Sequence, residues 1–292
     1  MNKKIIQSAV RAAQFIDQIP WMDQLAERFM ERFDWFKFQP RTILCLGAIN
    51  HVILTELSKR FTHSQIHLAD VSSERMQAIT ASVPKKIVQI QIDSESLPLV
   101  DQTFDLIVSY GWLQWCYLPK IMPELFRILK ADGLLMFTTL GPDSLQEVKQ
   151  SWAFDVGYHH VNDFVDMHDM GDLLLAHGFV DPVMDVELFQ VQYQDMTQIM
   201  HDLKHLGSCN IHPHRAPGLV GKTKFAHFSK AYQQLADDSQ TLPLSWEIIY
   251  GHAWMPNQRV FTVDQQNQEV VIPLTAIGRA KSSNDHDEPD DQ

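Results

Sequence analysis

The sequence has little of what membrane and secreted proteins need. None of its apolar runs reaches the roughly 18 residues that a membrane-spanning helix requires. The N-terminal segment MNKKIIQSAVRAAQF has a short basic start but no apolar core of signal-peptide length. We therefore expect a cytoplasmic protein.

Cysteine and clustered basic residues are also scarce. Cys45, Cys116 and Cys209 lie far apart without a CxxC pair, which argues against a disulfide framework or a structural zinc site and fits thiols in a reducing compartment. The formal net charge is -12 and Lys and Arg form no dense run. A general nucleic-acid binder is disfavoured, because phosphate contacts need clustered cations. An acidic protein partner would need a local basic patch.

What the sequence does have is the patterning of an α/β protein. From Thr42 onward, short apolar runs alternate with amphipathic stretches, which is typical of a doubly wound sheet with parallel strands buried on both faces. The pattern predicts strands at 42–46, 65–69, 87–92, 104–110, 133–139, 183–193 and 245–254. It predicts helices at 52–60, 73–82, 119–129, 167–177, 196–206 and 222–235.

The expected organisation has five parts. Apolar positions at helical spacing on both sides of Pro20 predict two N-terminal helices, and a helical pair inserted between late strands suits a substrate lid. We expect an N-terminal helical flap at 1–40, an α/β core at 41–195, a helical lid at 196–240, a final strand region completing the core at 241–280, and a disordered acidic tail at 281–292.

Two carboxylates follow strands where an open α/β sheet binds its ligand, beyond the carboxyl ends of the strands. Asp70 follows the second predicted strand, where it can accept hydrogen bonds from ribose hydroxyls; the alternative is a cap for the next helix. Asp93 follows the third strand and precedes a Leu97-Pro98 turn. The alternative there is a pair of capping turns.

These residues and several later motifs together resemble a known family. Asp70, Asp93 with Leu97-Pro98, FDLI (104–107), LQWC (113–116) and FRILKADG (126–133) resemble class I S-adenosylmethionine-dependent methyltransferases. The segments TTLGPDSL (138–145), VDMHDMGD (165–172), GFVDPVMD (178–185), DLKHLG (202–207) and WEIIYGHAW (246–254) are similar to the malonyl-acyl-carrier-protein O-methyltransferases of biotin synthesis and to the methyltransferase-like assembly factor of respiratory complex I.

The resemblance implies a Rossmann-like seven-stranded sheet, S-adenosylmethionine as cofactor and an acyl carrier protein, or another acidic protein, as partner. We expect a monomer. It implies that the cofactor contacts come from Leu46, Gly47, Asp70, Val71, Asp93, Ser94 and Ser109.

The first loop departs from the family pattern Asp-x-Gly-x-Gly-x-Gly, which becomes Cys45, Gly47, Ile49 and His51 here. The glycines allow positive φ and close approach to the cofactor, and a β-branched Ile49 disfavours both. A tyrosine of the family's N-terminal segment is Ile16 here. Besides the enzyme, two readings stay open: a non-catalytic assembly or binding factor, and a protein-modifying member similar to the complex I factor.

Methyl transfer to a carboxylate needs positioning rather than a base, because the nucleophile is already ionised at neutral pH. We therefore expect no catalytic acid or base. The resemblance places the substrate beyond the fourth strand, near Gln114 and Trp115, with lid cations to hold its negative charge. Core packing of Trp112 or Trp115 and solvated lid charges are the alternatives. The candidate cations are Arg215 and Lys222, with Lys224 beside them.

The histidines of the lid raise the question of a metal. His201 and His205 share a helix face, and His212 and His214 follow. No carboxylate or cysteine completes a recognised spacing around them. We expect no metal site.

Overall fold

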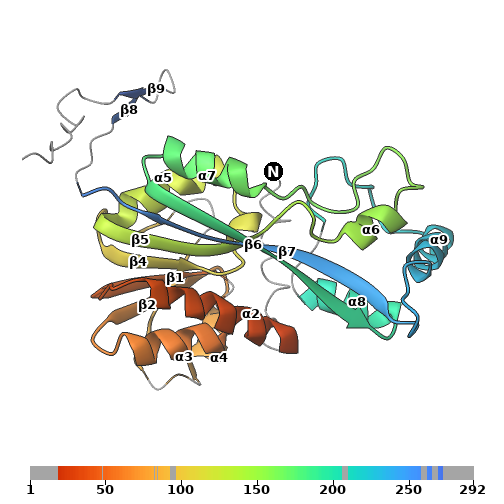
Figure 1. Ribbon diagram of the computed structural model, residues 1–292, viewed down its shortest axis with the longest axis horizontal. Helices are drawn as coiled ribbons and strands as arrows, with labels where there is room; N and C mark the ends of the chain where they lie inside the picture. Colours follow the sequence, from red (N-terminus) through yellow and green to blue (C-terminus); the bar gives the residue numbers. More distant parts are fainter. Residues whose placement is uncertain are drawn as a thin grey trace, which may run out of the picture.

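A computed structural model describes residues 19–47, 49–81, 83, 85–92, 97–205, 210–257, 262–264 and 269–271 (Figure 1). Its centre is a seven-stranded sheet in the order β3-β2-β1-β4-β5-β7-β6. The strands are β1 (Thr42–Leu46), β2 (Gln65–Asp70), β3 (Val88–Gln91), β4 (Phe104–Ser109), β5 (Leu129–Leu140), β6 (Val180–Tyr193) and β7 (Leu242–Trp254).

The predicted doubly wound fold is confirmed, with one difference in strand direction. Strands β1 to β5 pair in parallel, whereas β7 is antiparallel to both β5 and β6. Parallel neighbours need crossover connections, whereas the antiparallel neighbours β6 and β7 are joined by residues 194–241, which contain two helices.

Helices cover both faces of the sheet (Figure 1). On one face lie α2 (Pro20–Glu31), the 3₁₀ turn η2 (Arg32–Trp35), α3 (His51–Arg60) and α4 (Ser73–Ala81), and on the other lie α5 (Leu118–Ile128) and α7 (Met167–Ala176). Because side chains alternate along a strand, Ile43 and Cys45 of β1 join the core on the first face. Leu44 and Leu46 join the core on the second.

Local sequence signals fix where the helices begin. Pro20 opens α2 at a position that needs no backbone N–H donor. Asn50 caps α3 by accepting a hydrogen bond from the Ile53 N–H (3.1 Å). Asp166 caps α7 in the same way through the His168 N–H (2.8 Å).

A lid-like group of elements lies at one end of the sheet. Strands β6 and β7 run on together past their neighbours, and α8 (Met196–His205) and α9 (Lys222–Gln233) are connected between them, with α6 (Gln146–Ser151) packed beside α9 (Figure 1). The chain order therefore agrees with an insertion between late strands. The division into five domains remains a prediction.

The element boundaries differ from the predicted ones in a few places. Strand β5 starts at Leu129 rather than at 133, so the preceding helix ends at Ile128, and β6 starts at Val180 rather than 183. Helix α6 and the 3₁₀ turn η3 (Leu113–Trp115) were not predicted. Strands β8 (Thr262–Asp264) and β9 (Glu269–Val271) pair only with one another.

Some predictions fall outside the described residues: the first N-terminal helix with Ile16, and the acidic tail. Among the helices that the structure does describe, none is long and apolar enough to cross a membrane.

Candidate functional site

The strand ends β1, β2 and β4 bring predicted cofactor residues to one edge of the sheet. Gly47 follows β1 with a φ of +75°, and its N–H donates to the carbonyl of Ala69 in β2 (3.0 Å). Asp70 ends β2, and Ser109 ends β4. The arrangement is the one in which open α/β sheets bind ligands.

The Asp70 carboxylate is buried and already has partners. Its side chain is 2% exposed. Oδ1 accepts the Ser72 N–H (2.8 Å), and Oδ2 pairs with Nη1 of Arg75 (2.7 Å). Burial raises the pKa of Asp70 above its ordinary value, while the nearby Arg75 charge and hydrogen bonds act in the opposite direction.

Arg75 links Asp70 to the first loop. Its side chain is 3% exposed. Nη1 also donates to the Gly47 carbonyl (3.0 Å), and Nη2 donates to the Ile49 carbonyl (2.9 Å). One guanidinium thus joins the end of β2 to the two loop positions on either side of residue 48.

Trp112 covers the remaining glycine. A Cβ placed on Gly47 would collide with the Trp112 indole, which is 1% exposed. Close by in sequence, the Ser109 hydroxyl and the Gln114 side-chain oxygen are buried and have no hydrogen-bond partner among the described residues. Buried polar atoms of this kind call for an explanation, such as a ligand.

The other predicted cofactor residues are placed as follows. Leu46 is fully buried, and the Val71 carbonyl accepts a hydrogen bond from Gln91 (3.1 Å). Asp93 and Ser94 lie outside the described residues.

Cys45 points into the core on the face of α2 and α3, where burial raises the pKa of its thiol far above the ordinary range.

These residues fit S-adenosylmethionine in type and position. A glycine with positive φ, a carboxylate at the end of β2 and a buried hydroxyl without a partner among the described residues lie at one edge of the sheet. Two of the three are engaged by the chain's own side chains, however, because Trp112 covers Gly47 and Arg75 binds Asp70.

A cavity of about 810 Å³ lies on the lid side of the same edge. Helix α6, which follows β5 at its carboxyl end, contributes Val148, and the preceding Leu145 also lines it. The rest of the wall includes aromatic side chains and three cations: Trp152, Tyr158, Phe164, Phe225, Phe228, Lys204, Arg215 and Lys224.

Of the predicted substrate residues Gln114, Trp115, Arg215 and Lys222, one lines the cavity and three do not. Arg215 lines the cavity and forms no ion pair with another described residue. Lys222 is exposed at the start of α9 and is not among the lining residues, which include Lys224 instead. Gln114 and Trp115 lie in η3 and do not line the cavity either.

Sequence reasoning missed the aromatic wall between α6 and α7. Trp152 stacks on His160 (ring centroids 4.0 Å apart) and on Phe228 (4.6 Å). His160 also bonds Asp155 (3.0 Å), which pairs with Lys224 (2.7 Å). The density of aromatic and histidine residues in SWAFDVGYHH was the available signal, because exposed loops rarely concentrate such side chains.

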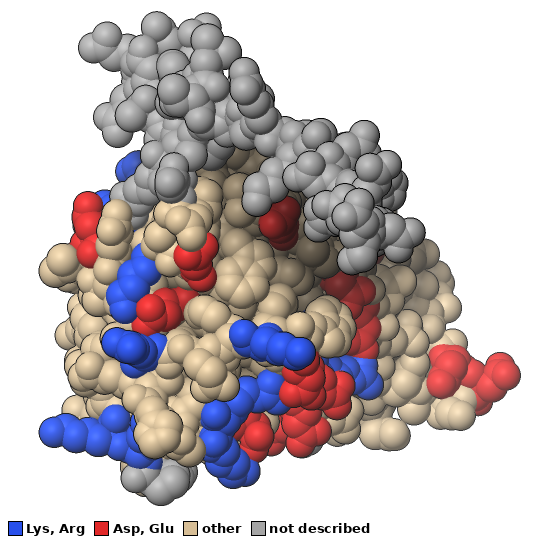
Figure 2. Space-filling model, turned by 60° about the vertical axis from the view of Figure 1, so that its left-hand side comes forward, with Lys and Arg blue, Asp and Glu red and all other residues tan. Residues whose placement is uncertain are grey.

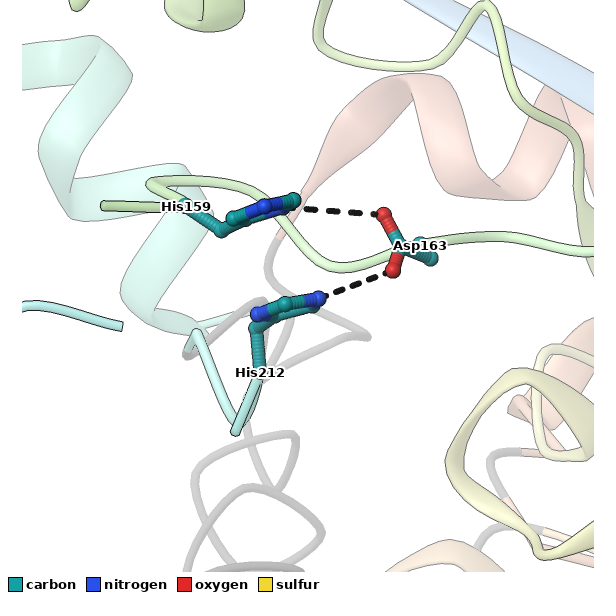
Figure 3. Close-up of side chains that lie close together, drawn as sticks. All are labelled: His159, Asp163 and His212. Atoms are coloured by element: carbon teal, nitrogen blue, oxygen red, sulfur yellow. Dashed lines mark hydrogen bonds and ion pairs between the residues drawn. The ribbon is translucent and has the colours of Figure 1, made fainter. Parts of the chain in front are cut away.

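Three polar side chains meet near the cavity (Figure 3). The rings of His159 and His212 stack with centroids 3.9 Å apart, and both face the carboxylate of Asp163. The Asp163 oxygens lie 2.8 Å from Nε2 of His212 and 4.0 Å from Nδ1 of His159.

The hydrogen bonds of His212 oppose metal binding at this cluster. The His214 N–H donates to Nδ1 of His212 (3.0 Å), so Nε2 carries the hydrogen and donates to Asp163. A metal ion at this cluster would bind through the lone pair of Nε2. The ring hydrogen would then have to move to Nδ1, where it would face the His214 N–H. His201 pairs with Asp202 instead (3.3 Å). The expectation of no metal remains a prediction.

The opposite end of the molecule offers little for an acidic partner. Figure 2 brings forward the side away from α8 and α9. On its described surface, basic and acidic side chains lie next to one another and neither sign gathers in one area.

Comparison with known proteins agrees with this geometry. A family model described as "Methyltransferase domain" matches residues 44–137. The malonyl-[acyl-carrier protein] O-methyltransferase of Gallionella capsiferriformans is 35% identical over 271 residues, covering 89% of this chain and 93% of that protein. The protein of the same name from Legionella pneumophila is 34% identical over 257 residues, covering 87% and 89%.

Among solved structures, the YcgJ protein of Bacillus subtilis matches with a TM-score of 0.56 at 12% identity, covering 80% of this chain and 100% of that one, which supports the fold alone. The sheet order and the match over residues 44–137 define a class I methyltransferase. Within that class, the chain belongs to the family of the malonyl-[acyl-carrier protein] O-methyltransferases. The predicted family is confirmed.

Proposed function

We propose that this protein transfers a methyl group from S-adenosylmethionine to the free carboxylate of a malonyl group carried by an acyl carrier protein. The observation that carries the proposal is the similarity to malonyl-[acyl-carrier protein] O-methyltransferases over about nine-tenths of the chain, which includes the elements around the cavity as well as the common core.

The chemistry needs few protein groups. A carboxylate oxygen forms a bond to the methyl carbon while the bond from that carbon to the sulfonium sulfur breaks, and the electron pair stays on sulfur. Because a malonyl carboxylate is ionised at neutral pH, no residue has to remove a proton. The protein positions the two reactants and excludes water.

The cavity residues match what the carboxylate or a carrier phosphate requires. Arg215 offers a planar guanidinium with no ion-pair partner among the described residues, and guanidinium binds such anions through two parallel hydrogen bonds. The stacked Trp152 and Phe228 form an apolar wall beside it. We therefore assign anion recognition to Arg215 and leave Lys222 outside the site.

The test is a methylation assay with malonyl-acyl carrier protein, read by the mass of the methyl ester. Arg215→Ala should raise KM by roughly 10- to 100-fold, since a hydrogen bond to a charged group contributes about 1.5–3 kcal/mol. Lys222→Ala, a nearby cation outside the cavity, should leave KM within about twofold. Absence of the ester with wild-type protein that binds cofactor would contradict the proposed substrate.

A second candidate is a non-catalytic member that retains the fold for binding or assembly. The observation that favours it is the engagement of Gly47 by Trp112 and of Asp70 by Arg75. Calorimetric titration with S-adenosylmethionine separates the two, because a non-catalytic member should show no heat of binding at millimolar cofactor.

We further infer a monomer that works in the cytoplasm. The described cysteines, Cys45 and Cys116, are both buried free thiols, which suits a reducing compartment. Sedimentation equilibrium of the purified protein measures its molar mass and so tests whether it is a monomer, because a dimer would give twice the mass of one chain.

A further inference from the structure

Arg75 binds Asp70, the carboxylate to which the resemblance assigns a ribose. A ribose diol offers two O–H donors to one carboxylate. Here the Asp70 carboxylate receives its donors from inside the protein, namely the Ser72 N–H on Oδ1 and the Arg75 guanidinium on Oδ2. Guanidinium and diol therefore compete for the same oxygen atoms.

Burial strengthens this competition. Asp70 and Arg75 are 2% and 3% exposed, and a buried carboxylate is costly unless it is paired. Arg75 neutralises that charge, so a neutral ribose must replace a charged partner with two neutral hydrogen bonds. Charge-assisted hydrogen bonds are the stronger kind, and the internal partner is favoured.

Arg75 also holds the loop that has lost its glycines. Its two terminal nitrogens bind the carbonyls of Gly47 and Ile49, and the Ile49 side chain is fully buried. In a glycine-rich loop, backbone N–H groups can turn toward a ligand. Here the loop carbonyls are turned toward Arg75.

We propose that Arg75 is an internal competitor for the ribose-binding carboxylate, so that cofactor binds only when the guanidinium leaves Asp70, and Arg75 sets the cofactor affinity of this chain. This inference rests on the proposed methyltransferase function. The apparent dissociation constant equals the intrinsic one divided by the fraction of molecules in which Arg75 has moved away.

The test measures binding of S-adenosylhomocysteine by calorimetry to the wild type and to Arg75→Met, which keeps the length of the side chain but removes its charge and donors. We expect the dissociation constant of Arg75→Met to fall by about tenfold or more. Arg60→Met is the matched control. Arg60 pairs with Asp34 (2.7 Å), whose side chain is 68% exposed, and its replacement should leave binding unchanged.

A double variant keeps the proposal testable if Asp70 without its partner destabilises the fold. Arg75→Met combined with Asp70→Asn leaves no unpaired buried charge, and thermal melts of all variants report whether they fold. The double variant should lose most of the gain of Arg75→Met, because the gain acts through the carboxylate. If Arg75→Met does not fold, Arg75→Lys replaces it, because lysine is shorter and has no planar guanidinium fork. Arg75→Lys should also bind S-adenosylhomocysteine more tightly than the wild type does.

The outcomes separate this proposal from the proposed function. If the folded wild type binds and the Arg75 variant binds equally or more weakly, Arg75 is a brace for the loop and the competitor proposal is wrong while the function stands. If neither folded protein binds S-adenosylhomocysteine, both are wrong. Tighter binding by the variant supports both when the wild type also binds; binding by the variant alone supports the competitor proposal and contradicts the proposed function.

Discussion

Gly47 shows at the scale of one residue why a single loop glycine remains. Its φ of +75° is in the left-handed region, and a Cβ there would collide with Trp112. Gly47→Ala should lower the free energy of unfolding by about 1–2 kcal/mol because of the strained backbone and by about 1–3 kcal/mol because of overpacking. Urea unfolding measures the loss.

Gly171 in α7 is the control for this substitution. The nearest neighbour of an added Cβ there is Cγ of Met184, at 4.0 Å, and the position is helical. Gly171→Ala should therefore stabilise the protein by about 0.5–1 kcal/mol. Equal effects at the two glycines would show that Trp112 does not restrict Gly47.

The position of a residue that directly follows a strand can be predicted from the sequence. The position of a residue that contacts a distant part of the chain cannot. Gly47 and Asp70 lie where the pattern predicts them, because the ends of parallel strands share an edge. Arg75 was not singled out, and Trp112 was considered only as a residue that packs in the core. Arg75 reaches back 26 residues along the chain to Ile49, and no periodicity encodes such a contact.

At the scale of elements, Asp105 ties the start of β4 to the start of β1. Its Oδ2 accepts hydrogen bonds from the Thr42 N–H and hydroxyl (both 2.8 Å), and its Oδ1 bonds Lys130 (2.9 Å). Burial raises the pKa of Asp105, but the hydrogen bonds from Lys130 and Thr42 outweigh it and lower the pKa overall.

Asp105→Asn should cost roughly 1.5–3 kcal/mol, as for hydrogen bonds to a charged group. Because the pKa of Asp105 is depressed in the fold, its contribution is present above the unfolded value of about 3.9 and is lost as pH falls through the folded value. Denaturant unfolding at pH 7 and pH 3 measures both effects. Asp101→Asn, at a side chain that is 62% exposed, should change stability by less than about 1 kcal/mol.

The elements that sequence patterning missed are short or aperiodic. Helix α6 has only six residues and follows Leu145, whose φ of 58° is left-handed. The cavity wall between α6 and α7 has no repeat of 2 or 3.6 residues to detect. The longer strands and helices, in contrast, were found because their buried faces impose such a repeat.

At the scale of the whole molecule, three histidines make stability depend on pH. Burial lowers the pKa of His67, His160 and His252; for His160 it outweighs the opposing effect of the hydrogen bond that its ring makes to the Asp155 carboxylate. The fold therefore holds these rings neutral, and their contribution is present above the unfolded pKa of about 6.5 and is lost as pH falls below it.

The free energy of unfolding should accordingly decrease between pH 7.5 and pH 5.5, as measured by urea titration. His252 packs its ring edge-on against Phe36 (4.8 Å between centroids), and His252→Asn should reduce the slope of stability against pH. A wild-type stability that stays constant over this interval would contradict the prediction.

The paired strands β6 and β7 determine how parts of this protein could be exchanged with relatives. Their register is unbroken from Val183 opposite His252 to Tyr193 opposite Leu242, so every cut within it would leave strand edges exposed. A chimera that replaces residues 194–241 would keep the register intact and carry the entire helical insertion with it. The part of the cavity wall that includes Arg215 and Lys224 should therefore be transferable between family members as one unit, with the pair Tyr193 and Leu242 as its junction, while Trp152 and Tyr158 would stay with the recipient.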